Sequence, residues 1–114
     1  MKRVKLLEDD PLQRETRKLL LEVKGYQVAE PEEEADLVLM DLRIPRLEDG
    51  LAAIRSFKSA DPAMKVIILS GDLTGLRGSA EECLADAILE KPCPSGLLFR
   101  TIEAVLGGTN GLKS

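Results

Sequence analysis

The sequence predicts an α/β domain built around a parallel sheet. Five short apolar runs of strand length alternate with segments that have helical periodicity, a succession typical of doubly wound sheets. The run Leu37–Met40 is apolar at every position, as expected for a strand covered on both faces. Polar residues that can carry chemistry follow several of these runs. We therefore predict a doubly wound, five-stranded parallel sheet with its functional residues at the strand ends.

Composition limits the classes of function. The chain has 114 residues, enough for one domain. Its net charge is −4, and it lacks the clustered Lys and Arg that nucleic acids or anionic membranes require. It has no membrane-spanning apolar run, no signal-peptide core and only two cysteines, which favours a reduced, cytoplasmic chain. The absence of histidine excludes a histidine base, a histidine metal site and a phosphohistidine on this chain.

The first half of the chain is expected to form strands over residues 4–7, 26–28 and 37–40. Pro11 opens a predicted helix, because its missing N–H is not needed at that position, and Gly25 ends it. Arg and Lys occupy one face of this helix. On its other face, residues recur at helical spacing at Leu12, Thr16, Leu19, Leu20 and Val23.

The second half is expected to alternate helices and strands. A helix over residues 51–57 precedes the β-branched strand 66–69. A short helix over 80–84, a strand over 87–89 and a helix over 94–106 follow. We expect the domain to cover residues 1–107 and a flexible tail to cover 108–114.

Five polar groups follow the predicted strands: Glu8 and Asp9, Asp41, Ser70 and Lys91. In a parallel sheet these strand ends share one edge. Three carboxylates in one pocket would repel each other, and a hard divalent cation such as Mg²⁺ would relieve that repulsion. A carboxylate beside Mg²⁺, with a lysine and a hydroxyl nearby, suits phosphoryl transfer.

Each of these residues also has a simpler interpretation. Acids after strands often cap helices or face solvent, and a single lysine is usually a surface residue. The convergence of five suitable groups at the ends of four strands favours a functional site over these separate explanations.

The chain resembles the receiver domain of two-component response regulators (the CheY-like family) over essentially its whole length. The segments that carry the resemblance are Leu6–Pro11, Asp36–Asp41 with Pro45, Val66–Gly71, and Lys91 with Pro92. Each segment is weak alone, but all four occur in order at near-family spacing. The resemblance implies a flavodoxin-like sheet with strand order 2-1-3-4-5.

The resemblance also implies roles for residues. Asp41 would be the phosphoacceptor, charged by a phosphohistidine on a sensor histidine kinase or a histidine phosphotransfer protein. Such a domain phosphorylates and dephosphorylates at most itself. Ser70 and Lys91 would contact the phosphoryl group, and the Lys91–Pro92 peptide bond would be cis. The implied Mg²⁺ ligands are Glu8, Asp9, Asp41 and the backbone carbonyl of Arg43.

The link between the second and third strands departs from the family pattern. Seven residues, 29–35, reach at most about 23 Å, and the crossing needs about 19 Å. We therefore expect the family helix between Val28 and Leu37 to be missing. The sheet face that it normally covers would then expose apolar surface, which suggests self-association as a homodimer or a partner at that face.

Two further departures lie near the site. Asp49 stands where the family usually has glycine, and Gly50 follows it, which indicates a one-residue insertion over residues 46–49. Ile88 stands where the family typically has Tyr or Phe, so it cannot couple phosphorylation to output in the usual way.

Three alternatives remain open. A haloacid-dehalogenase-type phosphotransferase would need an acid where Arg43 stands. A nucleotide-binding domain is suggested by Gly71, Gly75 and Gly78, but their spacing does not fit. The third alternative is a receiver-like interaction module that no longer signals by phosphorylation.

Overall fold

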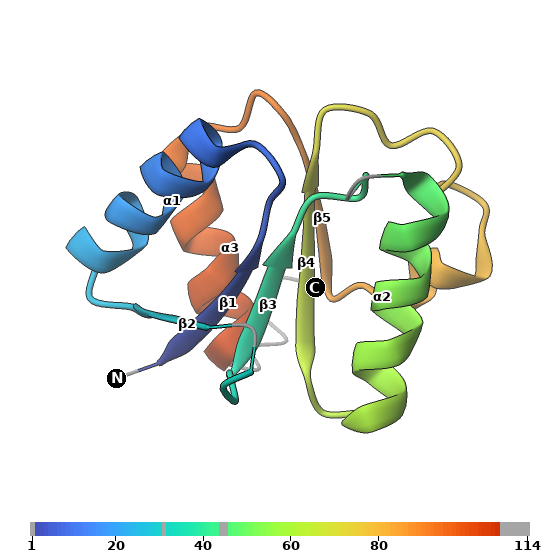
Figure 1. The fold of residues 1–114 in the computed structure, drawn as a ribbon, viewed down its shortest axis with the longest axis horizontal. Coiled ribbons are helices and arrows are strands. Elements are labelled where there is room, and N and C mark those ends of the chain that lie inside the picture. The colour runs from blue at the N-terminus through green and yellow to red at the C-terminus, as the bar shows by residue number, and fades with distance from the viewer. Residues whose placement is uncertain (1, 31, 44–45, 108–114) are drawn as a thin grey trace.

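The computed structural model describes residues 2–30, 32–43 and 46–107. Five strands form one parallel sheet in the order β2-β1-β3-β4-β5, with helices on both faces (Figure 1). This arrangement confirms the predicted fold class and strand order. The elements are β1 (Arg3–Leu7), α1 (Pro11–Val23), β2 (Gln27–Ala29), β3 (Leu37–Met40), α2 (Leu47–Ala60), β4 (Lys65–Ser70), the 3₁₀ helix η1 (Ala80–Leu84), β5 (Ala87–Glu90) and α3 (Ser95–Gly107).

Two apolar cores lie on opposite faces of the sheet. α1 and α3 cover one face, and α2 covers the other (Figure 1). Along β3, Leu37 and Leu39 belong to the first core, whereas Val38 and Met40 belong to the second. All four residues are buried, as the uniformly apolar run predicts. The middle of the sheet is therefore a rigid support for groups at its ends.

The link between β2 and β3 contains turns and bends but, within the described residues, no helix. This confirms the predicted missing helix. The link is fixed to the start of β1, where the Arg3 N–H donates to the Asp36 carboxylate at 2.8 Å and the Asp36 N–H donates to the Arg3 carbonyl at 2.9 Å. The sheet thus closes without a crossover helix.

Among the described residues, the large apolar side chains that are exposed lie on α1 and α3, so the expectation of exposed apolar surface at that sheet face is wrong. Strand β1 places Val4 and Leu6 in the core beneath α1 and α3, so Arg3 and Lys5 point to the opposite face. The Lys5 ammonium lies 5.9 Å from the ring centroid of Phe57 on α2. Long cationic side chains cover apolar surface with their stems while their charges stay in water. The structure therefore removes the basis for self-association through this face.

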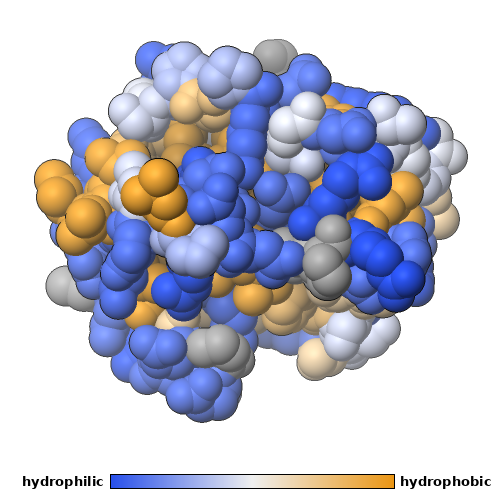
Figure 2. Space-filling model, turned by 45° about the horizontal axis from the view of Figure 1, so that its top comes forward, coloured by the Kyte–Doolittle hydropathy of each residue, from blue (hydrophilic) through white to orange (hydrophobic). Residues whose placement is uncertain are grey.

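Exposed apolar side chains gather instead on α1 (Figure 2). Leu12 and Val23 are 76% and 83% exposed, whereas Leu21 is fully buried. The amphipathic pattern thus located the helix, but its apolar stripe faces solvent. The side of α1 that faces the sheet carries Leu21 together with the half-buried Gln13 and Arg17. Because two of these three residues are polar, the hydrophobic pattern does not identify this side.

Helix α2 begins at Leu47, four residues before the predicted start, and its first turn contains residues 47–49 of the predicted insertion. Gly50 packs so tightly that a Cβ built on it would overlap the Leu42 carbonyl oxygen. Gly50, and not Asp49, therefore permits the close approach of α2 to the chain after β3.

Helix α2 ends at Ala60, three residues after the predicted end. The other boundaries match the predictions or differ by one or two residues, which is normal for helix and strand ends. Gly25 adopts a φ of 94° directly after the α1 cap residue, as expected of a helix-ending glycine. No helix of the described ranges combines the length and apolar character needed to cross a membrane. The predicted tail over residues 108–114, and Pro45, lie outside the described residues.

We predict that Leu21→Ala lowers the free energy of unfolding by about 2–5 kcal/mol, because it opens a cavity in the core. Val23→Ala, two residues along the same helix, should change it by less than about 0.5 kcal/mol. Urea unfolding measures both values. Similar losses for the two variants would contradict the observed orientation of α1.

Gly50→Ala should lower the free energy of unfolding by about 1–3 kcal/mol, since the new methyl group collides with backbone. Gly96→Ala is the matched control, because a Cβ at Gly96 in α3 meets no atom within 4 Å. That control should leave stability unchanged or raise it by up to about 1 kcal/mol through helix propensity. Thermal or urea unfolding distinguishes the two, and a neutral Gly50→Ala would contradict the packing.

Candidate phosphoacceptor site

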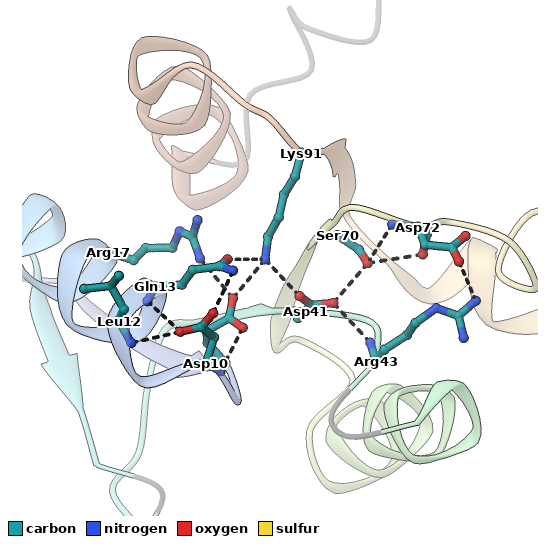
Figure 3. Close-up of polar contacts among 10 residues, drawn as sticks. Asp10, Leu12, Gln13, Arg17, Asp41, Arg43, Ser70, Asp72 and Lys91 are labelled. Atoms are coloured by element: carbon teal, nitrogen blue, oxygen red, sulfur yellow. Dashed lines mark hydrogen bonds and ion pairs between the residues drawn. The ribbon is translucent and has the colours of Figure 1, made fainter.

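Four strands deliver polar side chains to one edge of the sheet (Figure 3). Glu8 follows β1, Asp41 follows β3, Ser70 ends β4 and Lys91 follows β5. Because the strands are parallel, their carboxyl ends lie together, so residues scattered over 84 positions meet in one cluster. The structure thus brings together four of the five strand-end groups singled out in the sequence.

The Lys91 ammonium is the centre of this cluster. Its Nζ donates to Asp41 Oδ2 at 2.9 Å, to Glu8 Oε1 at 3.0 Å and to Gln13 Oε1 at 2.7 Å. These contacts use all three ammonium donors. The lysine side chain is 18% exposed, so its charge is only partly screened by water. One cation therefore offsets the repulsion between two carboxylates that face each other across it.

The second oxygen of Asp41 is also occupied. Asp41 Oδ1 accepts from the Ser70 hydroxyl at 3.0 Å and from the Arg43 N–H at 3.1 Å. Partial burial on its own would raise the pKa of the Asp41 carboxyl. The hydrogen bonds from Lys91, Arg43 and Ser70 outweigh burial and hold that pKa below its usual value of 3.8. Asp41 is therefore ionised at neutral pH and has the nucleophilic form of a carboxylate.

Ser70 is buried and has a second acceptor within reach. Its Oγ lies 3.2 Å from the Asp72 carbonyl oxygen as well as 3.0 Å from Asp41. A hydroxyl has one proton to donate. The Ser70 hydroxyl can therefore release Asp41 and remain hydrogen-bonded within the site.

Glu8 and Asp9 have different environments. The Glu8 side chain is 6% exposed, and its Oε1 accepts from both Lys91 and Arg17. Asp9 is exposed and makes no hydrogen bond or ion pair with other described residues. In the described part of the chain, no three acidic, histidine or cysteine side chains lie close enough together to hold a metal ion. The predicted acids do supply the hard oxygen donors that Mg²⁺ prefers.

Helix α1 contributes contacts that the sequence reasoning missed. Gln13 reaches Lys91, and Arg17 Nη1 lies 3.1 Å from Glu8 Oε1. Gln13 and Arg17 are four residues apart, on one face of a helix that starts close to Glu8. This spacing was the feature of the sequence that could have indicated their contacts with the site. Asp10 caps this helix by accepting from the Leu12 and Gln13 N–H groups.

Arg43 connects Asp41 to the loop after β4. Its guanidinium donates to the Thr74 carbonyl at 3.1 Å and lies 3.2 Å from the Asp72 carboxylate. Its backbone N–H holds Asp41, whereas the expected metal-binding role of its carbonyl remains a prediction. The Arg43 side chain thus connects the chain just after β3, two residues beyond Asp41, to the loop that borders Ser70.

Two expectations about β5 and its end can be compared with the structure. The Lys91–Pro92 peptide bond is cis, as the resemblance implied. Ile88 is half-buried against the core beneath α2, where it has neither the ring nor the hydroxyl of the residues typical at that position.

We predict that Lys91→Ala raises the pKa of Asp41, because burial remains while the ammonium is lost. A lowered carboxyl pKa stabilises the fold above the unfolded-state pKa of about 3.9, and that contribution disappears as the pH falls through the folded-state value. The free energy of unfolding of the variant should therefore be about 2 kcal/mol lower than that of the wild type at pH 7. This difference should become progressively smaller below about pH 4.

Urea unfolding at several pH values and a ¹³C NMR titration of the Asp41 carboxyl measure these effects. Lys2→Ala removes the same charge at an exposed site and serves as the control. An Asp41 pKa that is equal in the wild type and Lys91→Ala would contradict the assigned role of the ammonium.

Comparison with known proteins agrees with this geometry. Residues 4–103 match the response regulator receiver domain. The virulence transcriptional regulatory protein PhoP of Salmonella typhimurium is 32% identical over 127 residues, which cover the whole of this chain and 56% of PhoP. The chain thus spans little more than half of this curated relative.

Solved structures share the fold. A CheY-like response regulator receiver domain protein from Methanospirillum hungatei superposes with a TM-score of 0.83 at 26% identity, over 95% of each chain. The response regulator protein TrrA from Thermotoga maritima, solved in complex with Mg²⁺ and BeF, gives 0.80 at 23% identity, over 92% of this chain and 99% of TrrA. The chain belongs to the response regulator receiver domain family of two-component signalling.

Proposed function

We propose that Asp41 accepts a phosphoryl group from a phosphohistidine on a partner protein, a sensor histidine kinase or a histidine phosphotransfer protein. One observation carries the proposal: the Asp41 carboxylate is held ionised by Lys91, Ser70 and the Arg43 N–H at a strand end of a receiver domain. Membership of the receiver family supports the same role.

The chemistry is a transfer between two nucleophiles. An Asp41 oxygen attacks phosphorus, the phosphorus–nitrogen bond of phosphohistidine breaks, and its electron pair remains on the imidazole nitrogen. The product is an acyl phosphate on Asp41. Lys91 and Ser70 already contact the attacking carboxylate, so they are placed to donate to the equatorial phosphoryl oxygens. Their contribution is positioning and charge neutralisation.

A divalent cation would complete the charge balance. The carboxylates of Glu8, Asp9 and Asp41 and the carbonyl of Arg43 would hold Mg²⁺, which when bound neutralises charge on the phosphoryl oxygens. The donor chemistry fits, and the fold shared with TrrA, solved with Mg²⁺ and BeF, supports the proposal. We propose that the domain works in the cytoplasm and turns over only its own phosphoryl group, by self-phosphorylation and autodephosphorylation.

A second function is favoured by Ile88 and by the missing helix. A domain that has no aromatic switch residue and lacks one family helix could dock a partner without phosphorylation. The phosphorylation experiment below separates this interaction module from a phosphoacceptor.

Incubation with Mg²⁺ and acetyl phosphate should add one phosphoryl group to the wild type, detected by intact mass, because Asp41 is ionised and its neighbours stabilise the phosphoryl oxygens. Asp41→Asn should show no adduct. Asp49→Asn removes the same charge from the first turn of α2 and should be phosphorylated like the wild type. An unmodified wild type, or an adduct that persists in Asp41→Asn, would favour the interaction module or another acceptor.

A further inference from the structure

Glu8 is held by two cations at once. Arg17 Nη1 and Lys91 Nζ lie 3.1 and 3.0 Å from the same Glu8 oxygen. The carboxylate is 6% exposed and the Arg17 side chain 19% exposed, so both charges are largely removed from solvent. Such a pair is held more firmly than an ion pair on the surface.

This arrangement changes the charge of the site. Lys91 contacts both Glu8 and Asp41, and these three residues together carry a net charge of −1 when Arg17 is left out. Arg17 makes this four-residue cluster neutral, and with the exposed Asp9 included it changes the net charge of the site from −2 to −1. A less acidic site attracts a divalent cation less strongly, because each unit of charge adds its own Coulomb energy.

The guanidinium also takes a position on Glu8 that a metal ion would need. Glu8 faces Arg17 and Lys91, and no metal-binding group of acids is formed among the described residues. Arg17 extends from α1 on a long side chain that is partly exposed. It can therefore leave Glu8 without any change in the sheet.

We propose that Arg17 is a positioning residue that competes with the divalent cation for Glu8 and sets the Mg²⁺ concentration at which the site becomes competent. The inference rests on the proposed function, in which Glu8 is a metal ligand. Mg²⁺ displaces the guanidinium, and Lys91 keeps Asp41 and Gln13 as its partners. Arg17 thereby lowers Mg²⁺ affinity and prevents an acidic pocket from standing unbalanced when the ion is released.

The test is a Mg²⁺ titration without any phosphodonor, followed by amide chemical shifts in ¹H–¹⁵N NMR spectra. Arg17→Gln should bind Mg²⁺ about tenfold more tightly than the wild type, because one nearby positive charge is gone. Arg14→Gln removes the same charge one turn earlier, from a side chain with no contact to the described site residues, and should bind within about twofold of the wild type.

A measurement on the wild type needs no substitution and decides the matter if Arg17→Gln fails to fold. The Arg17 side-chain Nε–Hε signal should shift during the titration, with the same midpoint as the amides of the site. A signal that stays in place at saturating Mg²⁺ overturns the competition, as does equal affinity in the wild type, Arg17→Gln and Arg14→Gln.

The outcomes also separate this inference from the proposed function. A wild type that accepts phosphate on Asp41 while Arg17→Gln binds Mg²⁺ no better overturns only the competition. A wild type that binds Mg²⁺ more weakly than Arg17→Gln but takes no phosphoryl group overturns only the phosphoacceptor role. A chain that binds no Mg²⁺ in any variant overturns the competition together with the proposed metal site.

Discussion

The bridge that Lys91 makes between two carboxylates is the interaction on which the site depends. It connects the ends of β1, β3 and β5 through Glu8, Asp41 and Lys91, and Gln13 adds helix α1 to the same ammonium. The bridge places one positive charge between two acids at a largely buried edge. Without it, burial would raise the pKa of Asp41, whose ionised form is the nucleophile.

The sheet supplies the precision for this bridge. β3 and the last five residues of β4 are buried, so Asp41 and Ser70 lie at the ends of two strands that are packed on both faces. The neighbouring cations Lys91 and Arg17 have long side chains with several rotatable bonds, so each can exchange one acceptor for another when charge arrives. A rigid nucleophile surrounded by adjustable cations suits a reaction in which charge enters and leaves one carboxylate.

Much of this arrangement could be predicted because parallel strands place their ends together. The apolar runs indicated where the strands lie. The polar residues that follow these runs, Glu8, Asp41, Ser70 and Lys91, were therefore predicted to meet at one site. The alternation Arg3-Val4-Lys5 also showed that one face of β1 is charged, although the prediction of exposed apolar surface ignored it. The orientation of α1 could not be read the same way, because polar side chains that reach the site occupy its inner face. The Arg17 pairing depends on that orientation.

The central claim is that the groups around Asp41 stabilise a phosphoryl group on it. The most direct measurement is a crystal structure of the protein with beryllofluoride and Mg²⁺. The account predicts beryllium bound to an Asp41 oxygen, with Lys91 Nζ and Ser70 Oγ moved onto its fluorines and Lys91 released from Glu8. An unmodified Asp41, with Lys91 still bridging it to Glu8 under those conditions, would contradict the account.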